Sequence, residues 1–166
     1  MKVEEICTRA VRACTRETPL SEAGNIMWDA DCGFLPVVDE IGKVIGVVTD
    51  RDLCMALAVI GQPAAEVPIR VLLRPGLSTC RLSDEVRDAL RTMRSQKVRR
   101  LPVVDGAGVL QGVLSFSDIA LAAKPERLAG PADVTDEDLA LALKTLSARK
   151  STQPAPIPVP QSTAYV

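Results

Sequence analysis

The sequence predicts an α/β fold, classed as α+β in some schemes, built from two copies of one unit and followed by a C-terminal helix and a Pro-rich tail. The first observation is a repeat, because Leu35-Pro36-Val37-Val38-Asp39 returns 66 residues later as Leu101-Pro102-Val103-Val104-Asp105. The second is that apolar segments of strand length alternate with segments of helical periodicity, which is typical of a sheet covered by helices. The duplication indicates a function that lies in, or between, the two copies.

The same offset aligns the two copies without a gap. It pairs Val3 with Ile69, Ile6 with Leu72, Val11 with Leu77, Cys14 with Cys80, Ala23 with Ala89, Met27 with Met93, Gly42 with Gly108, Gly46 with Gly112 and Asp52 with Asp118. A lone unit of about 60 residues buries too little surface to be comfortably stable. We therefore expect the copies, at 1–66 and 67–124, to pack on each other, followed by an extension at 125–150 and a tail at 151–166.

The expected elements follow from periodicity and turn residues. In the first copy these are an extended segment over 11–15, a helix over 20–30, strands over 34–38 and 43–48, and a helix over 50–60 that Gly61-Gln62-Pro63 ends. In the second copy they are a helix over 84–95, a hairpin over 101–115 and a helix over 117–123. Asp39-Glu40-Ile41-Gly42 and Asp105-Gly106-Ala107-Gly108 form the two hairpin turns.

Beyond Lys124 the repeat ends and a different pattern begins. Thr135 and Asp138 have the spacing of a capping box, and Leu139, Ala142, Leu143 and Leu146 follow on one helical stripe. We expect that helix to pack on the repeat body or on a partner. The proline-rich residues 153–160 favour either an unstructured terminus or a Pro-rich ligand for a partner.

Composition excludes several classes of function. Apolar residues make up 47% of the chain and aromatic residues 2%, so aliphatic side chains must fill the core, with Met27 and Met93 in it. The net charge of −1 argues against general nucleic-acid binding, which needs a basic surface. Trp28 is expected either at a surface or interface, or buried under the terminal helix.

The cysteine pattern and the N-terminus favour a cytoplasmic location. The chain has five cysteines without paired metal spacing and no histidine, so we expect reduced, mostly buried thiols and no zinc site. We expect no secretory leader and no membrane span. No nucleophile–base pair or phosphate loop of an enzyme is visible, so we expect a protein without catalytic activity.

The strongest local motif closes each hairpin. Gly46-Val47-Val48-Thr49-Asp50-Arg51-Asp52 and Gly112-Val113-Leu114-Ser115-Phe116-Ser117-Asp118 each run from a strand into a helix. At such a junction, backbone N–H groups and the helix dipole favour an anion, and a carboxylate one turn later can accept from ribose hydroxyls. The same spacing also fits a capping box that only starts a helix. Spacing alone leaves both interpretations open.

Taken together, the doubled apolar-Pro-Val-Val-Asp strand and the Gly-x-x-Thr/Ser-x-x-Asp motif resemble the cystathionine β-synthase (CBS) domain family, and two tandem copies resemble a Bateman module. The resemblance covers roughly residues 1–124. It implies two β-α-β-β-α repeats packed with pseudo-twofold symmetry, with clefts between them that bind AMP, ADP, ATP, S-adenosylmethionine or, in some members, NAD-type ligands. It also implies a homodimer.

The resemblance assigns roles by position. Asp52 and Asp118 would hold ribose hydroxyls, and Thr49 and Ser115 would contact phosphate, with Ser117 as a second hydroxyl in the second copy. The remaining candidates would flank the base or line the same clefts: Gly33, Phe34, Leu35, Pro36, Arg99, Arg100, Leu101, Pro102, Thr15 and Arg81.

The copies differ in charge near these positions. Arg51 stands where the second copy has Ser117, and it would either pair with a phosphate or fill the cleft. Arg91, Arg94, Lys97, Arg99 and Arg100 form either a solvated helix face and loop or an electropositive entrance for a polyphosphate. We favour the second copy as the stronger nucleotide site. Two functions follow: an adenine-nucleotide sensor that regulates a client enzyme, channel or transporter, or an interaction module with empty clefts.

Overall fold

The computed structural model describes residues 1–130 and 133–148, and these residues form two compact units. One unit is Arg12–Leu77. The other joins Met1–Val11 to the described residues from Ser78 onward. The compact units are therefore offset from the sequence repeats, because the first residues of the chain pack with the second repeat.

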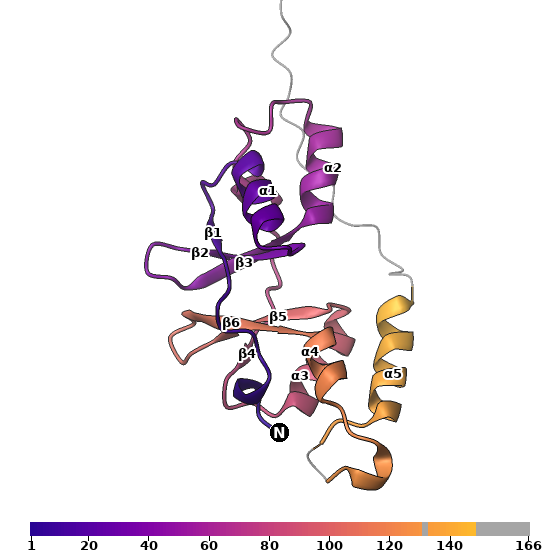
Figure 1. Cartoon of the computed structure of the whole chain (residues 1–166). Helices are drawn as coiled ribbons and strands as arrows, with labels where there is room; N and C mark the ends of the chain where they lie inside the picture. The colour runs from indigo at the N-terminus through magenta and orange to yellow at the C-terminus, as the bar shows by residue number, and fades with distance from the viewer. Residues whose placement is uncertain (131–132, 149–166) are drawn as a thin grey trace, which may run out of the picture. The chain divides into compact units, whose positions relative to one another are not determined.

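The Arg12–Leu77 unit is a three-stranded sheet with both of its α-helices on one face (Figure 1). Its elements are β1 (Cys14–Thr15), α1 (Leu20–Asp29), β2 (Phe34–Val38), β3 (Val44–Thr49), α2 (Asp50–Ile60) and the 3-10 helix η2 (Ile69–Leu72). β2 lies between β1, which runs parallel to it, and β3, which runs antiparallel. Leu35, Val37 and Val48 are fully buried beneath the helices, so the alternate residues of the strands form the core.

The second unit repeats this arrangement and adds to it. Its elements are η1 (Val3–Glu5), β4 (Cys80–Arg81), α3 (Val86–Gln96), β5 (Arg100–Val104), β6 (Leu110–Ser115), α4 (Phe116–Ala122), η3 (Glu126–Leu128) and α5 (Asp136–Ser147). The sheet order β4-β5-β6 and the registers match those of the first unit residue for residue. The predicted α/β fold and the duplicated unit are confirmed.

Element boundaries differ from the prediction by more than one residue in two places. The first strand is Cys14–Thr15 rather than 11–15, and α3 begins at Val86 rather than at Asp84. Asp84 instead accepts a hydrogen bond from the Arg81 backbone N–H at 2.8 Å, which forms a turn ahead of the helix. A local side-chain-to-backbone bond of this kind competes with helix formation.

In each unit, a crossing segment lies over the last strand of the hairpin. The residues before β1 cross β6, and the residues before β4 cross β3. Thr8 pairs with Val113 of β6 through two backbone hydrogen bonds of 3.0 and 2.9 Å. In the other unit, Leu73 lies over Gly46 of β3. A glycine lies at both crossings, since a Cβ at Gly46 would meet Leu73 Cδ2 at 2.6 Å and a Cβ at Gly112 would meet the Thr8 carbonyl oxygen at 2.5 Å. Glycine is required at Gly112, because its neighbour there is backbone rather than the end of a side chain.

The C-terminal helix α5 packs against α3, as Figure 1 shows. Val134 and Ala142 are fully buried in the same core as α3 and α4. The prediction that this helix packs on the repeat body is confirmed. The Pro-rich tail at 151–166 and the last two residues of the extension, 149–150, lie outside the described residues.

Several single-residue predictions are also resolved. Met27 and Met93 lie in the two cores, as predicted. Trp28 is 85% exposed, so the alternative in which it is buried under the terminal helix is wrong. Cys14 and Cys80 are buried, and burial raises the pKa of their thiols to about 11 and about 12. Cys7 and Cys32 are only partly buried and Cys54 is exposed, so the expectation of mostly buried thiols is wrong. Within residues 1–130 and 133–148, every helix is too short or too polar to cross a membrane.

We predict that Gly112→Ala destabilises the second unit by about 1–3 kcal/mol, because the new methyl group would displace a paired backbone carbonyl. Gly46→Ala is the matched control, since the end of the Leu73 side chain can rotate away. Urea unfolding midpoints of both variants test this. Equal stability of the two variants would contradict the prediction.

Candidate functional site

In the second repeat, the hairpin motif forms a capping box at the junction of β6 and α4. The Ser115 hydroxyl accepts from the Asp118 backbone N–H at 3.1 Å. Asp118 Oδ2 accepts from the Ser115 backbone N–H at 2.8 Å and from the Ser115 hydroxyl at 2.7 Å. These bonds fix the strand exit, the helix start and the orientation of the carboxylate.

The first repeat builds the same arrangement at the junction of β3 and α2. Asp52 Oδ2 accepts from the Thr49 backbone N–H at 3.0 Å and from the Thr49 hydroxyl at 2.6 Å, and the Thr49 hydroxyl accepts from the Asp52 N–H at 3.2 Å. The capping-box interpretation of both motifs is therefore confirmed. It does not exclude ligand binding, which stays a prediction.

Each capping box uses only one oxygen of its carboxylate. Among the described residues, Asp118 Oδ1 has no hydrogen-bond or ion-pair partner. Asp52 Oδ1 lies 3.9 Å from an Arg74 guanidinium nitrogen, at the limit of an ion pair, and both side chains are partly exposed. Both sites thus hold an oriented carboxylate, and a free oxygen is available to accept hydrogen bonds from vicinal hydroxyls.

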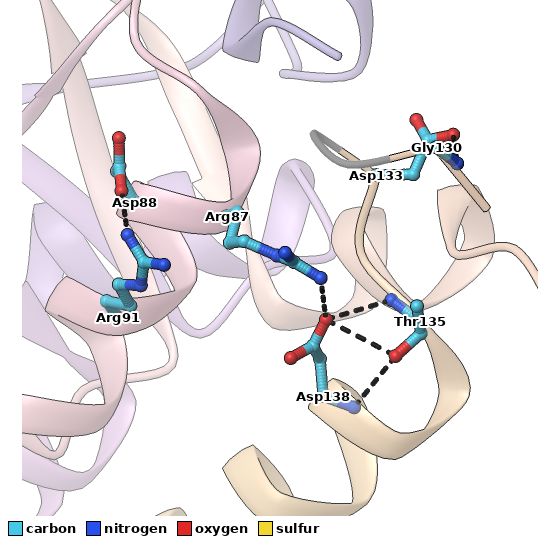
Figure 2. Close-up of polar contacts among 7 residues, drawn as sticks. All are labelled: Arg87, Asp88, Arg91, Gly130, Asp133, Thr135 and Asp138. Carbon is cyan, nitrogen blue, oxygen red and sulfur yellow. Dashed lines mark hydrogen bonds and ion pairs between the residues drawn. The ribbon is translucent and has the colours of Figure 1, made fainter. Parts of the chain in front are cut away.

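A further capping box shows that the cap alone is not a ligand site. Thr135 and Asp138 form the same bonds at the start of α5, outside the repeats. There, however, Arg87 of α3 donates to Asp138 Oδ2 at 2.7 Å, as Figure 2 shows. Thr135 is buried and Asp138 is bound to another helix, so this box serves helix packing.

The predicted base-flanking residues adjoin the junctions in sequence and in space. β2 pairs Phe34 with Thr49, and β5 pairs Arg100 with Ser115. The Gly33 carbonyl accepts from the Asp50 N–H at 3.3 Å and the Arg99 carbonyl from the Phe116 N–H at 2.8 Å. Leu35 and Leu101 are fully buried in the two cores. Pro36 and Pro102, next along each strand, are also buried.

The structure does not bring Thr15 and Arg81 to the junction of their own sheet. Thr15 pairs with Val38, whereas Thr49 pairs with Phe34, so they are separated by four residues of β2, roughly 13 Å. Arg81 occupies the equivalent place beside Val104. Thr15 is engaged in a turn with Thr18, because its backbone N–H donates to the Thr18 hydroxyl at 3.0 Å.

Sequence reasoning missed the crossing segments. Arg74 lies beside Asp52, and its equivalent under the 66-residue offset is Thr8, which is bonded to β6 two residues before Ser115. Arg9 lies near the second junction as well, because its Cα would be 3.7 Å from a Cβ on Gly112, three residues before Ser115. The repeat offset is the signal that relates these positions, although it does not reveal which sheet they contact.

The side chains near the two junctions are mainly carboxylates, hydroxyls and arginines. In the described part of the chain, no group of three His, Cys, Asp or Glu side chains is arranged to hold a metal ion. Ser117 at the second junction is exposed, and so are Arg99 and Arg100. Each site therefore combines an oriented carboxylate, a hydroxyl and strand backbone.

Comparisons with known proteins found a matching family model and similar sequences and structures. The sequence model of the CBS domain matches residues 3–59 and 66–124. The chain is 31% identical to the uncharacterized protein YlbB of Bacillus subtilis over 140 residues, which is 82% of this chain and 93% of YlbB.

Solved structures share the fold as well. The structure of CBSX2 in complex with AMP is 26% identical with a TM-score of 0.62, and the match covers 73% of this chain and 94% of CBSX2. The CBS domain pair of protein MJ0100, in complex with 5′-methylthioadenosine and S-adenosylmethionine, is 25% identical with a TM-score of 0.62 over 73% of this chain and 94% of that domain pair.

The Arg87–Asp138 contact predicts an acid-sensitive attachment of α5. Burial pushes the pKa of Asp138 up, but the bonds from Arg87 and Thr135 outweigh it and hold the pKa below the usual value. A pKa lowered by folding contributes stability above about pH 4 that is lost as the pH falls further. We expect Asp138→Asn to reduce the loss of urea stability between pH 6 and pH 3.5 by about 1 kcal/mol.

Asp88→Asn is the control for this measurement. Asp88 pairs with Arg91 on the same helix α3 at 2.6 Å, but both side chains are mostly exposed (Figure 2). Exposed pairs contribute little to stability. The attachment would be refuted if Asp138→Asn retained the full acid sensitivity of the unaltered chain, or if Asp88→Asn lowered it equally.

Proposed function

Because this chain belongs to the CBS domain family and carries two CBS domains in tandem, we propose that it is a non-catalytic regulatory module that binds adenosine-containing ligands. The candidate ligands are AMP, ADP, ATP and S-adenosylmethionine. The ligands held by CBSX2 and MJ0100 support this class, since AMP, S-adenosylmethionine and 5′-methylthioadenosine all contain adenosine.

One observation carries the proposal: each junction orients a carboxylate through one oxygen and leaves the other free of a close hydrogen bond. A ribose offers two vicinal hydroxyls to such an oxygen, and hydrogen bonds to charged groups are strong. At the second junction Ser115 and Ser117 would contact phosphate, and Thr49 has the equivalent place at the first. The backbone at 33–36 and 99–102 would flank the base. Asp118 is the stronger candidate, because Arg74 competes for Asp52.

The regulatory output would run through self-association and a client protein, such as an enzyme or a transporter. Large apolar side chains are exposed on several helices, including Trp28 of α1 at 85% and Leu121 of α4 at 89%. Exposed apolar surface of this kind supports an interface with a second copy of the chain. The second candidate function is an interaction module without a ligand, supported by the capping boxes, which are complete without one.

Ligand-dependent thermal shift tests the proposed function. We expect at least one compound among millimolar AMP, ADP, ATP and S-adenosylmethionine to raise Tm, because a ligand that binds only the folded state stabilises it. Asp118→Asn should raise Kd about tenfold or more and have a larger effect than Asp52→Asn, because it weakens the acceptor for the ribose.

Asp138→Asn is the matched control, because it alters the same kind of cap at a place where no ligand is proposed. It should leave Kd unchanged. If none of these compounds shifts Tm, the binding proposal fails and the interaction module is favoured. If Asp52→Asn has the larger effect, the ranking of the two sites is wrong.

Light scattering tests the proposed homodimer. We expect a mass of twice the 17.7 kDa chain, and a lower mass for Trp28→Ser at the same concentration. Ile41→Ser is the control, since Ile41 is equally apolar and 75% exposed but lies in the turn between β2 and β3. A monomeric unaltered chain would exclude the homodimer.

A further inference from the structure

Asp50 places a carboxylate on the first turn of α2, beside the first candidate site. Its Oδ1 accepts from the Arg51 backbone N–H at 2.6 Å. Its Oδ2 lies 2.5 Å from the position that a Cβ on Gly33 would occupy. The carboxylate therefore folds back over Gly33, and the glycine provides the space for it.

With this carboxylate, the protein itself supplies hydrogen-bond acceptors for the first backbone N–H groups of α2. The Asp50 N–H donates to the Gly33 carbonyl at 3.3 Å, and the Asp52 N–H donates to the Thr49 hydroxyl at 3.2 Å. The Arg51 N–H, which lies between them, donates to Asp50. The first three N–H groups of α2 thus have acceptors, so a phosphate at this end would have to displace one of them.

The second repeat lacks the carboxylate. Phe116 stands at the position of Asp50, and Arg99 stands at the position of Gly33. In the described part of the chain, neither the backbone N–H nor the hydroxyl of Ser117 has a hydrogen-bond partner. The two repeats therefore differ by the negative charge of Asp50, which Phe116 lacks. They also differ in the next backbone N–H, which has an acceptor at Arg51 and none at Ser117.

No ion pair neutralises the Asp50 carboxylate directly within the described residues. Arg74 lies 3.9 Å from Asp52 Oδ1, and within the described residues neither Arg51 nor Arg74 forms an ion pair with Asp50. A phosphate close to this carboxylate would be repelled by its like charge, and water at this exposed position weakens the repulsion without removing it. A neutral or cationic group would meet no such penalty.

We infer that Asp50 sets the ligand specificity of the first repeat: this site takes adenosine compounds whose 5′ group is uncharged or cationic, such as a thioether or a sulfonium, and rejects 5′-phosphates. The inference rests on the proposed function, because it needs the adenosine moiety to lie at the Thr49–Asp52 junction. The second repeat, with Phe116, accepts the phosphorylated ligand.

Isothermal titration of the full chain with two probes tests this inference. AMP and 5′-methylthioadenosine share the adenosine moiety and differ at the 5′ group. We expect AMP to bind one site per chain and 5′-methylthioadenosine to bind two. Asp52→Asn and Asp118→Asn assign each binding event to the first or the second repeat.

Asp50→Ser is the decisive variant, because it removes the charge and frees the Arg51 N–H while a helix-starting residue is kept. We expect it to tighten AMP binding at the first repeat by about tenfold or more, so that two AMP sites per chain are seen. Phe116→Ser is the matched control and should leave the AMP stoichiometry at one. Circular dichroism checks that both variants are folded.

The outcomes separate this inference from the proposed function. Two AMP sites of equal Kd in the unaltered chain would overturn the role of Asp50 and leave the sensor function standing. An unchanged AMP stoichiometry in folded Asp50→Ser would also overturn it. If neither probe binds, the specificity of the first repeat is overturned, and the proposed function fails as well if ADP, ATP and S-adenosylmethionine also leave Tm unchanged.

Discussion

The junction between the last strand of each hairpin and the following helix is the constraint on which this structure depends. A hydroxyl residue and an aspartate three positions later exchange hydrogen bonds with each other's backbone, at Thr49–Asp52 and at Ser115–Asp118. These bonds end the strand, begin the helix and hold the carboxylate in one orientation. The same few atoms therefore determine the local fold and the geometry of the candidate site, because an oriented carboxylate keeps one oxygen for a ligand.

Burial and packing around these junctions decide what each one does. At Thr135–Asp138 an identical box is covered by α3, and Arg87 binds its carboxylate, so the box attaches a helix. At the two repeat junctions the carboxylates stay partly exposed. Asp52 is additionally approached by Arg74 from a crossing segment, whereas Asp118 is not paired among the described residues. One sequence pattern therefore supports a structural role in one place and a candidate binding role in two others.

The crossing segments explain why the compact units do not follow the repeat boundaries. Residues before β1 pair with β6, and residues before β4 lie over β3, with a glycine at each contact. Each candidate site thus receives residues from a segment that precedes the other repeat along the chain. A difference in that segment, Thr8 against Arg74, changes the charge at two sites that share the pairing of a hydroxyl with an aspartate.

The sequence by itself determined the repeat, the alternation of strands and helices, the capping boxes and the α5 stripe, since these depend on local spacing and on the 66-residue offset between Leu35 and Leu101. Tertiary structure alone decided the rest. It separated Thr15 from Thr49 by the length of β2, brought Arg74 to Asp52, and placed the Asp50 carboxylate over Gly33. Those contacts depend on strand register and on chain segments distant in sequence, and a backbone path of that kind leaves no periodic signal in the residues themselves.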